Sequence, residues 1–122
     1  MKKRTWRAVF FSAAEGIADT FRTERNFRIH VLITCIIIIA GIICHVSAVD
    51  WMLLTLAIGM VLGAELMNTG VEAAVDLSSP DWHPFAKKAK DAAAGAVLIS
   101  SIVAIVIGII VFAEPILSWF IK

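Results

Sequence analysis

The chain has 122 residues, which is enough for one small domain. Hydrophobic residues other than glycine make up 60 % of it, and charged residues make up only 17 %. A soluble globular chain has about 45–50 % apolar residues and about 25 % charged residues, so this composition excludes a disordered tail and argues against a water-soluble domain. The formal net charge of +1 gives no basic excess for nucleic acid. The sequence therefore predicts a membrane protein that does not bind nucleic acid.

The first predicted element is an amphipathic helix over residues 4–27. Its apolar side chains recur at steps of three and four residues and share one helix face: Trp6, Phe10, Ala13, Ile17 and Phe21. Charged side chains lie away from this stripe. A soluble core helix would show the same pattern, but three strongly apolar segments follow. We therefore expect this helix to lie in the membrane interface with its aromatic face toward the lipid.

Three transmembrane helices are predicted over residues 29–46, 51–76 and 92–113. The first and third contain no formal charge, and the third would extend about 33 Å as a helix, enough to cross a bilayer. The second is uncharged only as far as Ala64. We expect it to continue through Glu65 to Asp76, because no helix-breaking residue occurs before Pro80. The predicted fold is all-α and multi-pass.

The distribution of lysine and arginine predicts the orientation of these helices. Seven of the eleven basic residues precede the first span, and three more lie between the second and third spans. The link at 47–50 has none. Because cytoplasmic loops carry an excess of lysine and arginine, the N-terminus and the second loop are expected in the cytoplasm.

A row of acidic and amide side chains lies near the end of the second span. At 100° per residue, Glu65, Asn68, Glu72 and Asp76 fall within about 80° of one another on a single helix face. Ionisable groups at membrane depth usually face a bundle interior or a water-filled cavity, and they are functional candidates by default. Glu65 is the deepest of the four and the hardest to explain structurally.

This acidic face is compatible with more than one function. Carboxylates can hold Mg²⁺, and a carboxylate can take a proton from an alcohol, as phosphoryl transfer requires. The same row could relay protons or cations. Gly59 and Gly63 could instead pack helices in a non-catalytic assembly. The chain has no P-loop, dinucleotide-binding glycine motif, zinc-ligand spacing or nucleophile elbow, so an ATP site would use charged groups near the helix ends.

Three stretches resemble the bacterial integral-membrane diacylglycerol kinase family, and together they extend over most of the chain. They are RTERNF (22–27), AELMNTGVEAAVD (64–76) and HPFAKKAKDAAAGAV (83–97). The middle motif, E-x-x-N-[ST]-x-[IV]-E-x-x-x-D, is highly specific. The first and third are most similar to the Gram-positive branch of this family, which phosphorylates undecaprenol.

The resemblance implies a homotrimer of three-span protomers in the bacterial cytoplasmic membrane. Its active sites would lie at the cytoplasmic interface and be shared between neighbouring protomers. By the match to the family motif, Glu65 corresponds to the general base, and Glu24 and Glu72 correspond to the acids that hold Mg²⁺. From composition alone, Glu24 would be taken for a surface ion pair among arginines.

The resemblance also implies an ATP-binding set of polar residues. Its members are Asn68, Asp81, Trp82, His83, Lys90 and Asp91. An N-terminal arginine contacts ATP in this family, and both Arg4 and Arg7 remain candidates for it. Asp76 is a further candidate site residue, or else an ordinary solvated helix end.

The function predicted from the sequence is ATP-dependent phosphorylation of a membrane lipid alcohol. The expected acceptor is undecaprenol, which would yield undecaprenyl phosphate. Phosphorylation of diacylglycerol to phosphatidic acid is the alternative, because the apolar segments do not distinguish a prenol from a glycerolipid. A small proton- or cation-conducting membrane protein is a more distant alternative.

Overall fold

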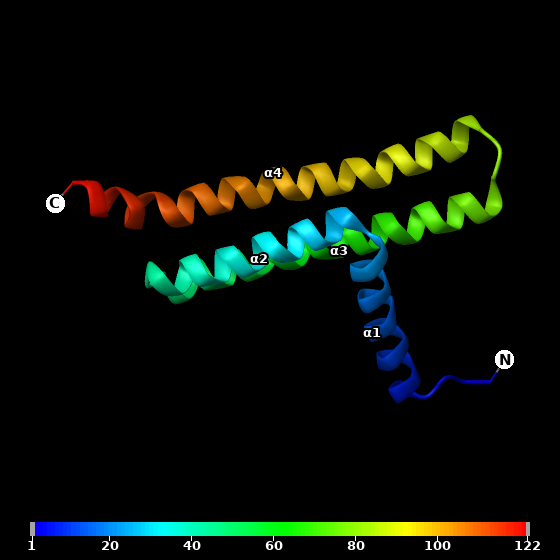
Figure 1. Cartoon of the computed structure of the whole chain (residues 1–122), viewed down its shortest axis with the longest axis horizontal. Coiled ribbons are helices and arrows are strands. Elements are labelled where there is room, and N and C mark those ends of the chain that lie inside the picture. The colour runs from blue at the N-terminus through cyan, green and yellow to red at the C-terminus, as the bar shows by residue number, and fades with distance from the viewer. Residues whose placement is uncertain (1, 122) are drawn as a thin grey trace.

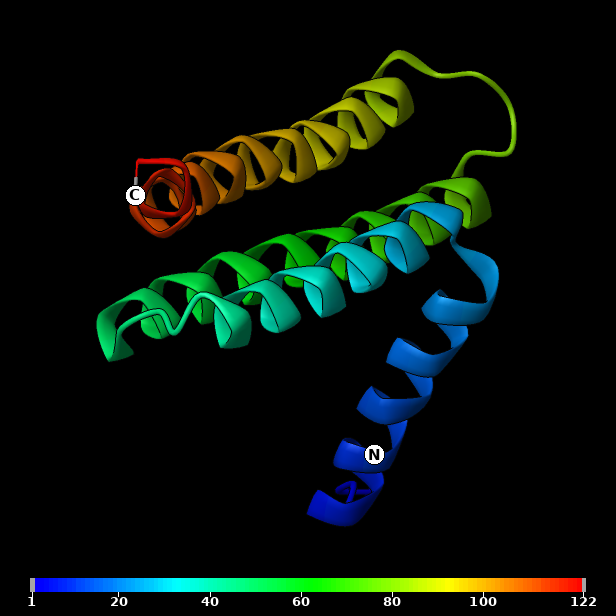
Figure 2. The same ribbon diagram turned by 60° about the vertical axis from the view of Figure 1, so that its left-hand side comes forward.

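The structure is a computed structural model that describes residues 2–121, and it consists of four helices (Figure 1). They are α1 (Trp6–Thr23), α2 (Arg25–Ile43), α3 (Ala48–Ser78) and α4 (Pro84–Phe120). No strand occurs among the described residues, which confirms the all-α prediction. By length and composition α2, α3 and α4 can each cross a membrane, so the structure has the expected three helices long and apolar enough to span one. They run side by side, whereas α1 leaves the start of α2 at a steep angle (Figure 2).

The boundaries of these helices differ from those expected at 4–27, 29–46, 51–76 and 92–113. The first helix ends at Thr23, because Glu24 has an extended backbone (φ −103°, ψ 111°) and Phe27 already belongs to α2. The longest difference is in α4, which begins eight residues before the apolar segment at 92. Backbone hydrogen bonding continues through the charged residues there, so the polarity of a segment does not end its helix.

A tight turn makes α2 and α3 antiparallel neighbours. His45 lies in the left-handed region with φ 51°, and the amides of His45 and Val46 donate to the carbonyls of Ile42 (3.3 Å) and Gly41 (3.2 Å). This pair of bonds is a Schellman ending with histidine at the position that glycine usually takes. A capping box follows, in which the Asp50 amide donates to Oγ of Ser47 (3.1 Å) and the Ser47 amide donates to Oδ2 of Asp50 (3.2 Å).

The close approach of α2 to α3 depends on Gly41. This glycine is buried, and a Cβ built on it would lie 2.6 Å from Cη2 of the Trp51 ring. Carbon atoms in contact are about 3.5–4.0 Å apart, so a side chain at this position would push the two helices or the ring apart. The absence of a side chain therefore lets the Trp51 ring pack directly on the backbone of α2.

The buried face of α3 carries Leu54, Ala57, Val61 and Glu65, at steps of three and four residues. Helix α3 packs along α4 over much of its length and contacts α2 less extensively. Most other large apolar side chains of the three long helices are exposed in the single chain, which is the pattern of helices that face lipid or a second protein chain.

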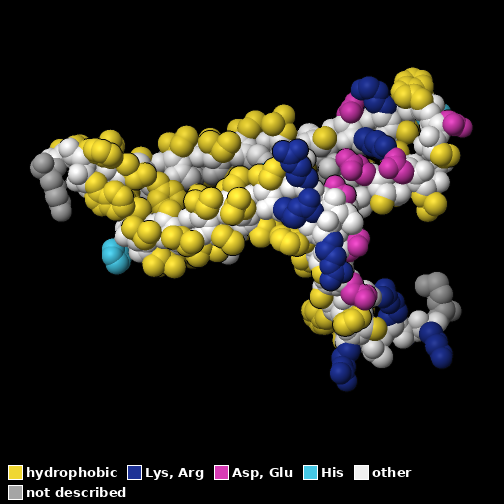
Figure 3. Space-filling view, viewed as in Figure 1, with side chains coloured by type: hydrophobic (Ala, Val, Ile, Leu, Met, Phe, Trp, Pro, Cys, Tyr) yellow, Lys and Arg dark blue, Asp and Glu magenta, His cyan; other side chains and the backbone are white. Residues whose placement is uncertain are grey.

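Charged side chains gather on α1 and at the end of the bundle that bears the α3–α4 loop, and hydrophobic side chains cover the opposite end (Figure 3). The aromatic side chains at the start of α1 are largely uncovered by the rest of the described chain: Trp6 and Phe10 are 80 % and 72 % exposed. An unpartnered aromatic face on a helix that leaves the bundle is compatible with the interfacial placement predicted for it.

We predict that Gly41→Leu destabilises the fold by about 1–3 kcal/mol, because overpacking a close contact forces neighbouring groups to move. The matched control is Gly16→Leu, since a Cβ at Gly16 meets nothing within 4 Å. Unfolding of both variants in mild detergent, followed by circular dichroism, measures the difference. Equal stability of the two variants would contradict the close packing of α2 on Trp51.

Candidate active site

The carboxylate of Glu65 is buried inside the bundle. Glu65 is 4 % exposed and lies one turn beyond Val61 on the face of α3 that packs on the other helices. Burying a charge is costly unless it is paired or hydrogen-bonded. The group beside it is His30 of α2, whose Nε2 lies 3.4 Å from Oε1 of Glu65. The structure therefore buries the residue that the sequence singled out as deepest.

The next two residues of the acidic face contact each other. Nδ2 of Asn68 donates to Oε1 of Glu72 over 3.4 Å. Oδ1 of Asn68 is buried and has no hydrogen-bond partner among the described residues. Buried polar atoms are nearly always satisfied in native proteins, so an acceptor of this kind indicates a donor or a cation still to be supplied. Glu65, Asn68 and Glu72 thus lie along one face of α3, as predicted.

The other predicted metal ligand, Glu24, lies at the elbow between α1 and α2. Its side chain accepts a long hydrogen bond of 3.5 Å from the Thr23 hydroxyl. Across residues 2–121, no three His, Cys, Asp or Glu side chains lie close enough together to hold a metal ion. Oxygen donors of the kind that Mg²⁺ prefers are present at Glu24, Asn68 and Glu72, but the single chain does not gather three carboxylates at one point.

The predicted nucleotide-binding pair lies where α3 and α4 are joined by ion pairs. The Lys90 ammonium contacts the carboxylate of Asp76, and this hydrogen bond raises the pKa of Lys90, which precedes the apolar part of α4. Asp91 is paired with Lys87 one turn earlier. Both pairs are solvent-exposed and contribute little to stability, so the ammonium and the carboxylate remain free to exchange partners. The sequence did not assign a role to Asp76, and in the structure its carboxylate is the ion-pair partner of Lys90.

The predicted adenine loop leads directly into α4. Asp81, Trp82 and His83 are exposed, and Trp82 is 77 % exposed. His83 has a structural role that the sequence analysis missed: it is the N-cap of α4, and its Nδ1 accepts from the Phe85 amide at 3.1 Å. The proline that follows it at the first helical position was the available sequence signal.

The N-terminal arginines lie on the α1 side of the molecule. The Arg4 guanidinium donates to the Ser12 hydroxyl, and Arg7 is exposed in the first turn of α1. Sequence analysis missed the role of Arg28, whose Nη1 donates to the carbonyls of Phe21 (2.9 Å) and Arg22 (2.8 Å). These bonds satisfy carbonyl groups at the end of α1 and hold the elbow that carries the predicted metal ligand.

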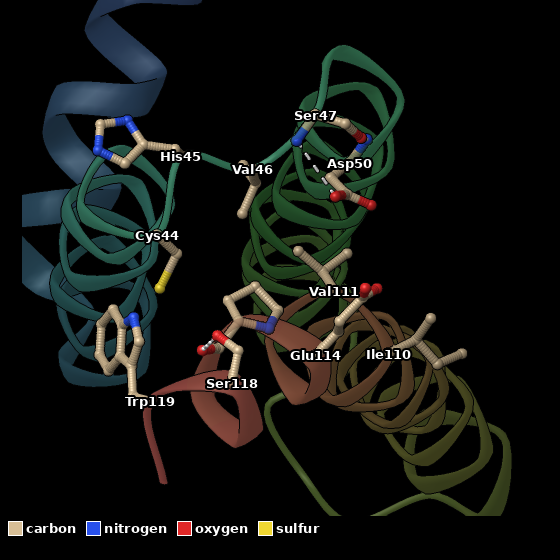
Figure 4. Close-up of a pocket in the computed structure, with 11 residues that line it drawn as sticks. Cys44, His45, Val46, Ser47, Asp50, Ile110, Val111, Glu114, Ser118 and Trp119 are labelled. Carbon is tan, nitrogen blue, oxygen red and sulfur yellow. Dashed lines mark hydrogen bonds between the residues drawn. The ribbon is translucent and has the colours of Figure 1, made fainter. Parts of the chain in front are cut away.

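Two cavities lie away from this charged end. One has a volume of about 720 Å³ and is lined mainly by apolar side chains of α2, α3 and α4, together with His30. The other, of about 470 Å³, lies between the α2–α3 turn and the end of α4, where Glu114, Ser118 and Trp119 face Cys44 and Asp50 (Figure 4). None of the site residues predicted from the sequence lines either cavity.

Comparison with known proteins shows a match over most of the chain. Residues 11–112 match the family model of the prokaryotic diacylglycerol kinases. The chain is 44 % identical over 103 residues to the undecaprenol kinase of Bacillus subtilis, covering 84 % of each chain. It is 37 % identical over 125 residues to a diacylglycerol kinase of Synechocystis, covering 97 % of this chain and 71 % of that one. A diacylglycerol kinase of Helicobacter pylori is 35 % identical over 100 residues, or 82 % and 77 % of the two chains.

The matched residues include both predicted metal ligands, the buried glutamate and the lysine–aspartate pair. Arg4 and Arg7 lie outside them. The matching segment therefore contains every predicted site residue except the two arginines between which the sequence did not decide.

Proposed function

Because this chain belongs to the prokaryotic diacylglycerol kinase family and is a multi-pass membrane lipid kinase with ATP as phosphate donor, we propose that its acceptor is undecaprenol. The product would be undecaprenyl phosphate. The support is the greater identity to the Bacillus subtilis undecaprenol kinase, 44 % against 37 % and 35 % for the two diacylglycerol kinases. Diacylglycerol, with phosphatidic acid as product, is the second candidate, since those relatives are also similar over most of the chain.

The observation that carries the proposed mechanism is a buried carboxylate beside an unsatisfied buried oxygen. Glu65 has little access to water. Asn68 lies one turn further along α3, and its buried Oδ1 has no hydrogen-bond partner among the described residues. This order supports a proton acceptor buried in the bundle at Glu65, with oxygen ligands closer to the charged end of the molecule. Such an arrangement suits a reaction between a lipid alcohol and a water-soluble phosphate donor.

In the proposed reaction, the oxygen of the lipid hydroxyl attacks the γ-phosphorus of ATP, and Glu65 accepts the proton of that hydroxyl. The bond between the γ-phosphorus and the β,γ-bridging oxygen breaks, and ADP leaves. The transferred phosphoryl group ends on the lipid, and the proton ends on the carboxylate. Burial of Glu65 keeps water from competing with the alcohol for the phosphoryl group.

The proposed metal is Mg²⁺, held by Glu24 and Glu72. Bound Mg²⁺ would supply charge neutralisation for the triphosphate. The oxygen donors present at these residues and at Asn68 fit this ion, and the family uses ATP. Since one chain does not gather a complete set of acids, we propose that protomers of a homotrimer share each site. Gly59 and Gly63 leave room for close packing between protomers, because a Cβ built on either glycine meets no described atom within 4 Å.

The proposed nucleotide site lies at the charged end, which we place on the cytoplasmic side. Lys90 and Asp91 would exchange their present partners for the nucleotide, and the exposed loop of Asp81, Trp82 and His83 would lie near the adenine. Either Arg4 or Arg7 would reach the phosphates from α1. The crowding of lysine and arginine at this end supports the orientation, because cytoplasmic segments carry this excess (Figure 3).

An assay with two lipids tests the choice of acceptor. We predict that the purified chain in phosphatidylcholine vesicles transfers labelled phosphate from ATP to undecaprenol at least about tenfold faster than to diacylglycerol, which corresponds to about 1.4 kcal/mol. Both lipids are supplied at the same mole fraction, and vesicles without a lipid alcohol give the background. Labelling of diacylglycerol alone would replace undecaprenol by the second candidate.

The metal assignment is tested by Glu72→Gln. We predict that this change weakens Mg²⁺-dependent ATP binding at least about tenfold, because an anionic oxygen ligand becomes a neutral amide. Equilibrium binding of a fluorescent ATP analogue with and without Mg²⁺ measures it. The control is Glu15→Gln, an exposed acid of α1 with no proposed role, which should leave binding unchanged. Unchanged affinity in the Glu72 variant would remove this residue from the metal site.

A further inference from the structure

The proposed base has one ionisable neighbour, and no prediction from the sequence assigned that neighbour a function. His30 of α2 places Nε2 3.4 Å from Oε1 of Glu65 on α3. Among the described residues, no other ion pair or side-chain hydrogen bond to this carboxylate is formed. The two groups are in contact without a well-aligned hydrogen bond, and catalytic contacts are often long or poorly aligned until substrate binds.

The backbone of α2 around the histidine is held by several contacts. Its carbonyl accepts a hydrogen bond of 2.8 Å from the Thr34 hydroxyl, one turn along α2. Phe27, one turn before it, is only 3 % exposed and anchors the start of α2. Arg28 ties that same turn to the end of α1. Phe27 and Arg28 thus anchor the turn of α2 that precedes His30 and brings its imidazole to the carboxylate.

His30 also lines the apolar cavity of about 720 Å³ between α2, α3 and α4. It is the only titratable residue among those that line it, since the remainder are apolar, glycine, serine or threonine. The imidazole therefore lies between the buried carboxylate and an apolar space within the bundle.

We propose that His30 is a positioning residue for Glu65. Its Nε2–H donates to one carboxylate oxygen, fixes the rotamer of the side chain, and leaves the second oxygen directed toward the acceptor hydroxyl. The inference rests on the proposed function, in which Glu65 accepts the proton of that hydroxyl. Orientation of this kind matters because misplacing a reacting group by about 1 Å can cost about a hundredfold in rate.

Two substitutions of His30 in the full-length protein, reconstituted in lipid vesicles, test this role. His30→Leu removes the donor, and we expect kcat to fall about tenfold to a hundredfold with KM for ATP within about twofold of wild type. His30→Gln keeps an N–H donor at a similar distance along the side chain, and we expect its kcat to stay within about fivefold of wild type. Rescue by the donor-bearing side chain is what a purely structural role would not produce.

The matched control is His45→Asn, which changes the exposed histidine at the other end of α2 to a residue that tolerates its left-handed backbone. We expect its kcat to equal that of wild type. Wild-type kcat in His30→Leu, or an equal fall in the leucine and glutamine variants, would overturn the proposal. If the leucine variant does not fold, a folded glutamine variant with less than a tenth of wild-type kcat would overturn it alone.

Failure of this inference can be told from failure of the proposed function by including Glu65→Gln. Full activity of that variant would reject the proton acceptor itself. Loss of activity in Glu65→Gln together with an unaffected His30→Leu would reject only the positioning role.

Discussion

The structure buries one carboxylate, that of Glu65, among the apolar helices of the bundle, where an ionised group is energetically costly. Glu65 is 4 % exposed on α3, at the end of a stripe whose other members are leucine, alanine and valine. Burying a charge in such surroundings costs free energy unless polar groups pair with it or hydrogen-bond to it. The imidazole of α2 provides one such group, and the amide of Asn68 begins a polar path from the buried glutamate toward the charged end.

This constraint explains why α3 extends beyond its apolar segment. A helix that ended at Ala64 would lack Glu65 and the two acids that follow it on the same face. Continuing to Ser78 brings Glu72 and Asp76 to the level of α4's first turns, where Lys90 meets Asp76. The bundle thus carries its hydrophobic surface along most of its length and its charges at one end and on α1 (Figure 3). A lipid confined to the bilayer and a soluble phosphate donor can meet only at such a boundary.

Features with a period along one helix could be predicted from the sequence. The three apolar segments, the stripe on α1 and the acidic face of α3 each follow from helical spacing, and the structure has a helix at every one of them. The similarity in the motif around Glu65 and Glu72 also identified the family that the comparison shows. Each of these features is a pattern within a single helix, so a short continuous segment of sequence is enough to predict it.

Contacts between helices could not be predicted in this way. The approach of His30 to Glu65 depends on how α2 is rotated against α3, and the pairing of Lys90 with Asp76 depends on how far α3 extends before the loop. The break at Glu24 was missed because no proline or glycine marks it in the sequence. It is held by Arg28, which donates to carbonyls six and seven residues earlier. Helix rotation, extension and elbow angle are tertiary properties that spacing along the chain does not specify.

The central claim is that the buried carboxylate of Glu65 takes the proton of a lipid alcohol. The most direct measurement is the single-turnover rate of phosphoryl transfer to the lipid in Glu65→Gln, at saturating Mg²⁺, ATP and acceptor. Since general-base catalysis contributes about 10²–10⁴ in rate, the account predicts a fall of that size with ATP affinity unchanged. Transfer at the wild-type rate would contradict it.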